Sequence, residues 1–250
     1  MHLSLTGRTA LVTGAATGIG RAIAAAMAEA GATVIVNHLG RAQEAAQAVA
    51  AIAAAGGSAW AVEADVSDSA AVRRMAAECL DRAGRLDILV NNAGILLEKP
   101  FLETTEADWD LVLATDLKSV FLCCRAFLPA LLASPGGNIV NVASELGYLG
   151  RAGFAAYAAA KAGVITLTRS LAREFAPALR VNAIAPGPVD TAMLSLDQMS
   201  AQARAKEAAI PMGRVGRVEE IAATAVFLAS DYASFYCGQT LSPNGGALMA

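Results

Sequence analysis

The sequence predicts one α/β domain over residues 1–250, with a doubly wound parallel sheet and helices on both of its faces. Short apolar runs rich in β-branched residues alternate with alanine-rich amphipathic stretches along the chain. That alternation is typical of strand–helix–strand units, which form parallel sheets. Because right-handed crossovers join parallel strands, few topologies remain, and the doubly wound sheet is the natural one.

The expected elements follow one another in a regular order. Strands are expected at residues 9–13, 33–37, 59–64, 86–91, 138–142, 180–184 and 239–241. The clearest amphipathic helices between them are expected at 20–30, 42–55 and 69–82. The least regular stretch, residues 186–214, is rich in Met, Ser and Gln, and loops of that length inside a compact domain are usually functional. We expect a substrate loop there; the alternative is a surface excursion that links two strands.

Composition argues against several classes of function. The net charge is −3, and the charged residues form no long runs, so a basic surface for nucleic acid is not expected. No apolar run reaches the roughly 18 residues of a membrane span, and the first residues lack a signal-peptide core. A cytoplasmic location is therefore the expectation. The four cysteines form no CxxC pair, so we expect no metal site.

The most informative side chains are those of Tyr157 and Lys161, with Ser144 upstream. The tyrosine and the lysine are four residues apart in a stretch expected to be helical, so they share one helix face. An ordinary phenol has a pKa of about 10, and a positive charge beside a phenol favours the phenolate. The hydroxyl of Ser144, just after an expected strand, can bind a substrate oxygen. This set predicts general acid–base chemistry on an alcohol or a carbonyl.

A glycine-rich turn at residues 13–20 follows the first expected strand and opens the first helix. Its glycines have the spacing GxxxGxG rather than GxGxxG. Glycine permits tight turning and close approach of the backbone, and the helix N-terminus offers free N–H groups to a pyrophosphate. The turn therefore predicts a dinucleotide site.

These segments resemble the short-chain dehydrogenase/reductase family over nearly the whole chain. The matching motifs are TGxxxGIG at 13–20, NNAG at 91–94, the serine at 144, YxxxK at 157–161, and PG at 186–187 with a threonine at 191. The resemblance implies a Rossmann-type fold and hydride transfer between a nicotinamide cofactor and a carbinol or carbonyl carbon. It implies that Tyr157 is the acid/base and that Ser144 orients the substrate oxygen. Lys161 would favour the phenolate and bind the nicotinamide ribose.

The resemblance also implies the contacts of the cofactor. Those residues are Gly14, Thr17, Gly18, Ile19, Gly20, Asp65, Val66, Asn92, Ala93, Gly94, Pro186, Gly187, Val189 and Thr191, together with Tyr157 and Lys161.

One position departs from the family pattern. The family usually has asparagine in N-L-x-[GS]-x-F, where this chain has Asp116. In the family that asparagine helps a water chain to relay protons to the lysine, partly through its backbone carbonyl. A charged Asp116 would stabilise protonated Lys161 by long-range attraction, whereas a buried one could itself be protonated. We expect activity to survive with a shifted pH profile; the alternative is that Asp116 is merely tolerated.

Cofactor choice depends on the residues after the second expected strand. Relatives that prefer NAD usually have an acid there to bind the adenosine ribose, whereas this chain has Asn37 and His38 followed by Arg41. We expect these three residues to contact the cofactor. Arg41 could pair with a 2′-phosphate; alternatively it is a solvated residue of the next helix. Against NADP(H), Thr17 stands where NADP-preferring relatives often have a basic residue. Because no carboxylate after the second strand would repel a 2′-phosphate, NADP(H) is favoured, with NAD(H) possible.

The resemblance leaves the substrate open between two groups of enzymes. The segment from Lys99 onward looks more like that of sugar and polyol dehydrogenases, and Pro129 stands where carrier-protein reductases tend to have a basic residue. We expect a small alcohol, sugar or polyol, with 3-oxoacyl-[acyl-carrier-protein] reductase as the alternative. A non-catalytic nucleotide-binding regulator is a further alternative, supported by Asp116 alone. The family also implies a homotetramer that packs through helices around 116–133 and 155–176.

Overall fold

The computed structural model describes residues 3–194, 197 and 199–249. Its central feature is a parallel sheet with strand order β3-β2-β1-β4-β5-β6-β7. The strands are β1 (Thr9–Val12), β2 (Thr33–His38), β3 (Ser58–Glu63), β4 (Ile88–Asn91), β5 (Gly137–Val142), β6 (Leu179–Ile184) and β7 (Thr240–Leu241). The order reverses between β1 and β4, so the sheet is doubly wound, as the sequence predicts.

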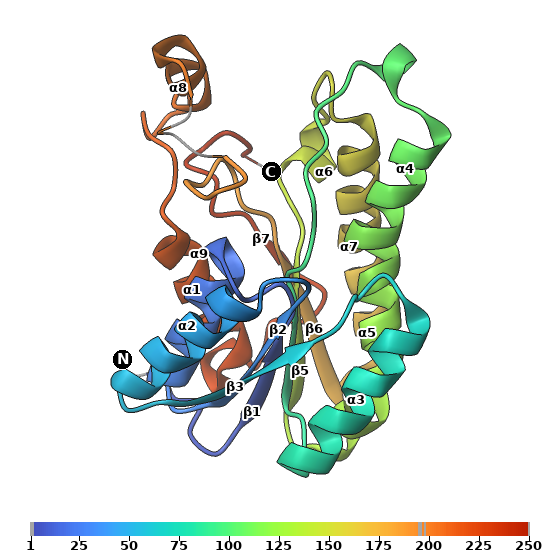
Figure 1. The fold of residues 1–250 in the computed structure, drawn as a ribbon, viewed down its shortest axis with the longest axis vertical. Coiled ribbons are helices and arrows are strands. Elements are labelled where there is room, and N and C mark those ends of the chain that lie inside the picture. Colours follow the sequence, from blue (N-terminus) through green and yellow to red (C-terminus); the bar gives the residue numbers. More distant parts are fainter. Residues whose placement is uncertain (1–2, 195–196, 198, 250) are drawn as a thin grey trace.

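Helices cover both faces of the sheet (Figure 1). One face carries α1 (Gly18–Glu29), α2 (Ala42–Ala54) and α9 (Val218–Ala229); the other carries α3 (Ser69–Ala83), α5 (Ser119–Ala133) and α7 (Ala155–Phe175). Successive strand residues point to opposite faces of the sheet, so each strand contributes side chains to two hydrophobic cores. Val34 and Val36 belong to the first core, whereas Ile35 belongs to the second. This two-sided burial explains why the strands read as continuous apolar runs.

The shorter elements lie mostly beyond the carboxyl ends of the strands. They are the 3-10 helices η1 (Phe101–Glu103) and η4 (Asp231–Ala233), the helices α4 (Glu106–Leu113), α6 (Leu146–Leu149) and α8 (Ala201–Glu207), and the π-helical turn η2 (Ala114–Lys118). The strands and helices expected from the sequence begin and end within two residues of those observed. Among its described residues, the stretch 186–214 contains the short helix α8 and isolated β-bridges at Val189 and Thr191; residues 195, 196 and 198 lie outside them.

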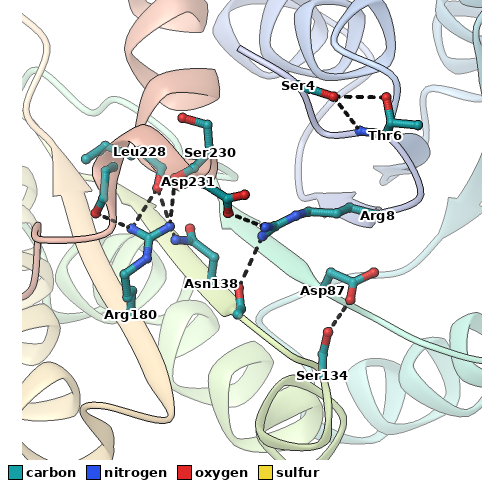
Figure 2. Close-up of polar contacts among 12 residues, drawn as sticks. Ser4, Thr6, Arg8, Asp87, Ser134, Asn138, Arg180, Leu228, Ser230 and Asp231 are labelled. Carbon is teal, nitrogen blue, oxygen red and sulfur yellow. Dashed lines mark hydrogen bonds and ion pairs between the residues drawn. The ribbon is translucent and has the colours of Figure 1, made fainter.

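At the amino-terminal edge of the sheet, polar residues form hydrogen bonds and ion pairs with one another (Figure 2). Asp87, buried just before β4, accepts hydrogen bonds from the Thr9 N–H at 2.8 Å, from Arg85 Nε at 2.9 Å and from the hydroxyl of Ser134. Although burial opposes it, these donors hold the pKa of Asp87 below its ordinary value. The group ties together the starts of β1, β4 and β5.

None of the helices in the described ranges is long and apolar enough to cross a membrane.

Candidate active site

A cavity of about 800 Å³ opens at the carboxyl edge of the sheet. Its walls come from the segments that follow β1, β2, β3, β4, β5 and β6, together with α7 and the stretch before α8. Ligands of open α/β sheets bind at this edge, beside the point where the strand order reverses. Every residue that the sequence analysis assigned to catalysis or cofactor binding lines this one cavity.

The glycine-rich turn is clamped against the NNAG segment. Thr13 Oγ1 accepts hydrogen bonds from the N–H groups of Asn92 and Ala93, both at 3.0 Å, and Asn92 Nδ2 donates to the Thr13 carbonyl at 2.9 Å. Gly14 has φ +60°, and a Cβ there would lie 2.9 Å from Ala93 Cα. Only glycine satisfies both the positive φ and the close approach.

The amino-terminal end of α1 fits a bound phosphate. Thr17, at the N-cap, makes no side-chain capping bond, and the first turn of α1 contains no acidic residue. The N–H groups of the first helical turn have no intrahelical partner, and the partial positive charge of the helix end attracts anions. Gly20 permits the close packing behind them, because a Cβ there would lie 2.4 Å from Asn92 Nδ2. This part of the cavity therefore has the features that a pyrophosphate requires.

Asn37, at the end of β2, and Asp65, just after β3, form hydrogen bonds within the protein. Asn37 is buried, accepts a hydrogen bond from the Gly14 N–H at 3.2 Å and donates to the Ala64 carbonyl at 3.1 Å. Asp65 Oδ1 accepts from the N–H and the hydroxyl of Ser67. Asn37 therefore holds the glycine-rich turn on the sheet, a role that its predicted place among the cofactor contacts did not reveal.

Two residues near this end bear on cofactor choice. His38 is buried, and its Nδ1 has no hydrogen-bond partner among the described residues. The Arg41 side chain is 60% exposed and pairs with Glu44 at 3.0 Å. Both His38 and Arg41 line the cavity, and no carboxylate occupies the position of His38.

Ser144, Tyr157 and Lys161 converge from two elements. Ser144 follows β5, and its hydroxyl accepts a hydrogen bond from the Leu146 N–H at 3.2 Å. Tyr157 and Lys161 lie one turn apart on α7, with Lys161 Nζ 5.5 Å from the centre of the tyrosine ring. Lys161 Nζ also donates to the Val142 carbonyl at 3.1 Å, so the ammonium is anchored to the end of β5.

Asp116 contacts the lysine directly, at closer range than the sequence analysis expected. It lies in the π-helical turn η2 and is fully buried, with Oδ2 3.3 Å from Lys161 Nζ. Its Oδ1 accepts from the Ile95 N–H at 2.9 Å. A π-helical turn inside a longer helix often marks a functional site, and here it carries Asp116 into the cavity wall.

The buried pair shifts the ionisation of both partners. Burial raises the pKa of Asp116, although Lys161 and the Ile95 N–H oppose the rise. Burial alone would lower the pKa of Lys161, but the charge of Asp116, helped by Tyr157, raises it above its ordinary value. The two donors that face Asp116, Lys161 Nζ and the Ile95 N–H, favour the carboxylate, so Asp116 and Lys161 form an ion pair.

The cavity also contains charged residues that the sequence analysis missed. Glu145, directly after Ser144, is buried, and its Oε2 has no hydrogen-bond partner within the described ranges. Arg151 and Glu207, which both line the cavity, form an ion pair through two hydrogen bonds of 2.5 and 3.1 Å. An acid next to the predicted serine was a usable signal for Glu145. No sequence pattern joins Arg151 to Glu207, since the two are 56 residues apart.

Comparisons with known proteins agree with this geometry. A family model described as "Enoyl-(Acyl carrier protein) reductase" matches residues 14–247. The 3-oxoacyl-[acyl-carrier-protein] reductase FabG of Staphylococcus aureus (strain Mu50) is 42% identical over 245 residues, which is 97% of this chain and 98% of the relative. The 3-oxoacyl-[acyl-carrier-protein] reductase of Synechocystis is 42% identical over 248 residues, covering 98% and 99% of the two chains.

Solved structures give the same result. A dehydrogenase/reductase from Sinorhizobium meliloti 1021 superposes with a TM-score of 0.94 at 37% identity, covering 99% of this chain and 98% of the other. A Beutenbergia cavernae structure, described as a "putative NAD(P) dependent gluconate 5-dehydrogenase" with bound NADP, gives 0.91 at 44% identity, covering 98% of each chain. The chain belongs to the short-chain dehydrogenase/reductase family, whose members are NAD(P)-dependent oxidoreductases that act on CH–OH groups.

Proposed function

We propose that this protein uses NADP(H) to interconvert a ketone and a secondary alcohol, on a small alcohol, sugar or polyol. The observation that carries the proposal is the convergence of Ser144, Tyr157 and Lys161 in the cavity that also contains the glycine-rich turn. An acid/base group, an oxygen-binding hydroxyl and a fixed cation are what proton transfer to a carbonyl oxygen requires.

Each residue has a defined part in this mechanism. The nicotinamide cofactor, when bound, supplies or accepts the hydride. The Tyr157 phenol gives a proton to the carbonyl oxygen in reduction and takes it from the hydroxyl in oxidation. The Ser144 hydroxyl binds the same oxygen, which fixes the reacting carbon. Lys161 Nζ, held by the Val142 carbonyl and Asp116, keeps a positive charge beside the phenol.

The proposed cofactor contacts follow from the walls of the cavity. The amino-terminal end of α1 would bind the pyrophosphate, and Asn92 to Gly94 would lie along the middle of the dinucleotide. NADP(H) is favoured because His38 replaces the usual acid and Arg41 lies at the same end. The bound NADP in the Beutenbergia cavernae structure supports this choice. Use of NAD(H) as well is compatible with the same walls.

A second candidate, 3-oxoacyl-[acyl-carrier-protein] reductase, is supported by the 42% identity to FabG of Staphylococcus aureus. A third, a non-catalytic nucleotide-binding regulator, is opposed by the complete set of Ser144, Tyr157 and Lys161. The first two candidates share the chemistry and differ in substrate, so activity assays with two classes of carbonyl compound separate them.

The testing experiment measures nicotinamide oxidation with acetoacetyl thioester and with a panel of keto sugars and small hydroxy ketones. NADPH and NADH are compared in parallel. We expect faster turnover with NADPH and with the hydroxylated ketones, and a loss of about 10²- to 10⁴-fold in Tyr157→Phe. Thioester reduction as the dominant activity would establish the second candidate. Cofactor binding without turnover of any carbonyl compound would establish the third.

We further propose a homotetramer in the cytoplasm, with residues 186–214 as the substrate loop. Large apolar side chains are exposed on α4 and α5, among them Leu111, Phe121 and Leu132, and Phe235 is fully exposed near the carboxyl end. Contiguous exposed apolar groups are typical of subunit interfaces. Sedimentation at micromolar concentration tests the assembly, and a monomer there would contradict it.

A further inference from the structure

We propose that Glu145 is a substrate-binding residue that accepts a hydrogen bond from a hydroxyl group close to the reacting carbon. It would thereby select hydroxy ketones and polyols over 3-oxoacyl thioesters. This inference rests on the proposed function, because it names the substrate class of the same cavity.

The backbone of Glu145 is fixed at the place where a substrate oxygen must lie. Its N–H donates to the Pro186 carbonyl at 3.0 Å, and its own carbonyl accepts from the N–H groups of Tyr148 and Leu149 at 2.9 and 3.0 Å. Consecutive Cα atoms are about 3.8 Å apart, so the side chain starts directly beside Ser144. Ser144 and Glu145 line the same cavity, so a substrate whose oxygen meets Ser144 occupies the cavity whose wall contains Glu145.

The carboxyl group of Glu145 is built into the cavity wall without a donor to satisfy it. The residue is only 8% exposed, it lines the cavity, and Oε2 has no partner in the part of the chain that the structure describes. Burial raises the pKa of Glu145 to about 7; Arg151 opposes the rise and Glu207 adds to it. An unsatisfied buried acceptor is costly, so its presence in a cavity wall indicates a ligand that donates.

The nearest cation is already engaged. Arg151 gives two hydrogen bonds to Glu207, from Nη1 at 3.1 Å and from Nη2 at 2.5 Å. Glu98 also lines the cavity, so three carboxyl groups and one guanidinium surround the substrate end. A ligand group that satisfies Glu145 must therefore bring its own proton, as a hydroxyl group does.

The two substrate classes would present different chemical groups to Glu145. Above its pKa of about 7, Glu145 is a carboxylate and can only accept hydrogen bonds. A 3-oxoacyl thioester has a second carbonyl oxygen near the reacting carbon, and at such pH that oxygen would face Glu145 as one acceptor against another. A hydroxy ketone or polyol has an O–H there, which forms a strong charge-assisted hydrogen bond with a carboxylate. Sites that bind a substrate hydroxyl in this way discriminate strongly against analogues without it.

The test uses a pair of ketones that differ by one hydroxyl, 3-hydroxybutan-2-one and butan-2-one, each reduced with NADPH. We expect wild-type kcat/KM to be at least about tenfold higher for the hydroxy ketone. Glu145→Leu should lower the ratio of the two kcat/KM values to about one. Glu145→Gln should retain part of the preference, since the amide oxygen still accepts. Glu78→Leu, which removes an exposed carboxylate on α3, is the matched control and should change neither value.

Two results would overturn the inference. An unchanged preference in Glu145→Leu would do so and leave the proposed function standing. Wild-type reduction of acetoacetyl thioester faster than that of the hydroxy ketone would overturn the inference and also establish the second candidate function. In both cases activity lost in Tyr157→Phe would still support the oxidoreductase. Absence of any turnover by wild type would defeat both proposals. Melting temperatures with and without NADPH identify a folding defect in Glu145→Leu. If that variant has such a defect, the substrate preference of Glu145→Gln tests the inference instead.

Discussion

The two edges of the parallel sheet differ in whether the protein supplies hydrogen-bond partners to the buried polar side chains compared here. At the amino-terminal edge, Asp87 and Arg180 are surrounded by protein donors and acceptors (Figure 2). At the carboxyl edge, Glu145 Oε2 and His38 Nδ1 are buried in the cavity wall without a partner among the described residues. Asn138 Oδ1 is an exception at the amino-terminal edge, although the amide nitrogen of that side chain donates to the Leu228 carbonyl.

This difference separates side chains that stabilise the fold from side chains whose hydrogen-bond partner would come from a bound ligand. Polar groups that satisfy one another gain from folding itself, because the folded state supplies all their partners. Polar groups left unsatisfied at a cavity cost stability until a ligand pairs with them. The comparison therefore predicts that substitutions at the amino-terminal edge change stability and leave specificity alone. Substitutions of the unpartnered carboxyl-edge groups, Glu145 and His38, should do the reverse.

The largest expected effect is on stability, from Arg180→Met at the amino-terminal edge. The Arg180 guanidinium donates to the carbonyls of Leu228 and Ala233 at 3.0 Å and of Ser230 at 3.1 Å, around the carboxyl end of α9. Methionine keeps the length of the side chain but removes the guanidinium bond to each carbonyl. Each carbonyl is left with one donor: Asn138 Nδ2 for Leu228, the Ala233 N–H for Ser230 and the Tyr236 N–H for Ala233. We expect the free energy of unfolding to fall by about 2–4 kcal/mol. Thermal melting at a fixed protein concentration measures the loss.

The matched control is Arg74→Met, which removes an exposed guanidinium on α3. It should melt within about 1 °C of wild type, because exposed substitutions rarely change stability much. The kcat of Arg180→Met below its melting temperature should equal that of wild type. A large loss of kcat with an unchanged melting temperature would mean that the two edges are not separate in function.

An intermediate effect is expected from Asp116→Asn at the carboxyl edge. The charge of Asp116 raises the pKa of Lys161 against the lowering effect of burial. Removing the carboxylate removes that rise, so Lys161 loses its proton at a lower pH and the positive charge beside Tyr157 disappears earlier as pH increases. The alkaline limb of the pH–rate profile should therefore move to lower pH, with the maximal kcat within about tenfold of wild type.

Asp110→Asn, an exposed carboxylate on α4, is the control for the general loss of one negative charge. Its profile should superimpose on that of wild type. Superimposable profiles for Asp116→Asn as well would show that the 3.3 Å contact with Lys161 has no part in the titration that limits the rate.

The sequence predicted the fold almost completely because its signals are local. Strand and helix periodicity, the glycine-rich turn and the YxxxK spacing each depend on a few neighbouring residues. All predicted site residues indeed line one cavity. The direct contact of Asp116 with Lys161 was not predicted, because it depends on a π-helical turn that carries no sequence signal here. The pairing of Arg151 with Glu207 depends on tertiary placement of α8, which periodicity cannot give.

The smallest expected effect comes from Arg41→Ala, at the outer rim of the carboxyl edge. Arg41 combines features of both edges. It has a protein partner in Glu44, and yet its side chain is 60% exposed at the cavity. An exposed ion pair contributes little, so the guanidinium can exchange Glu44 for a 2′-phosphate at low cost. We expect kcat/KM with NADPH to fall by about two- to fivefold and that with NADH to stay constant. Steady-state assays with both cofactors measure this.

Because the contribution of Arg41 is electrostatic and exposed, the NADPH preference should also weaken as salt is raised for wild type but not for the variant. An NADPH preference equal in both proteins at low salt would remove Arg41 from cofactor selection and leave the choice to the buried His38.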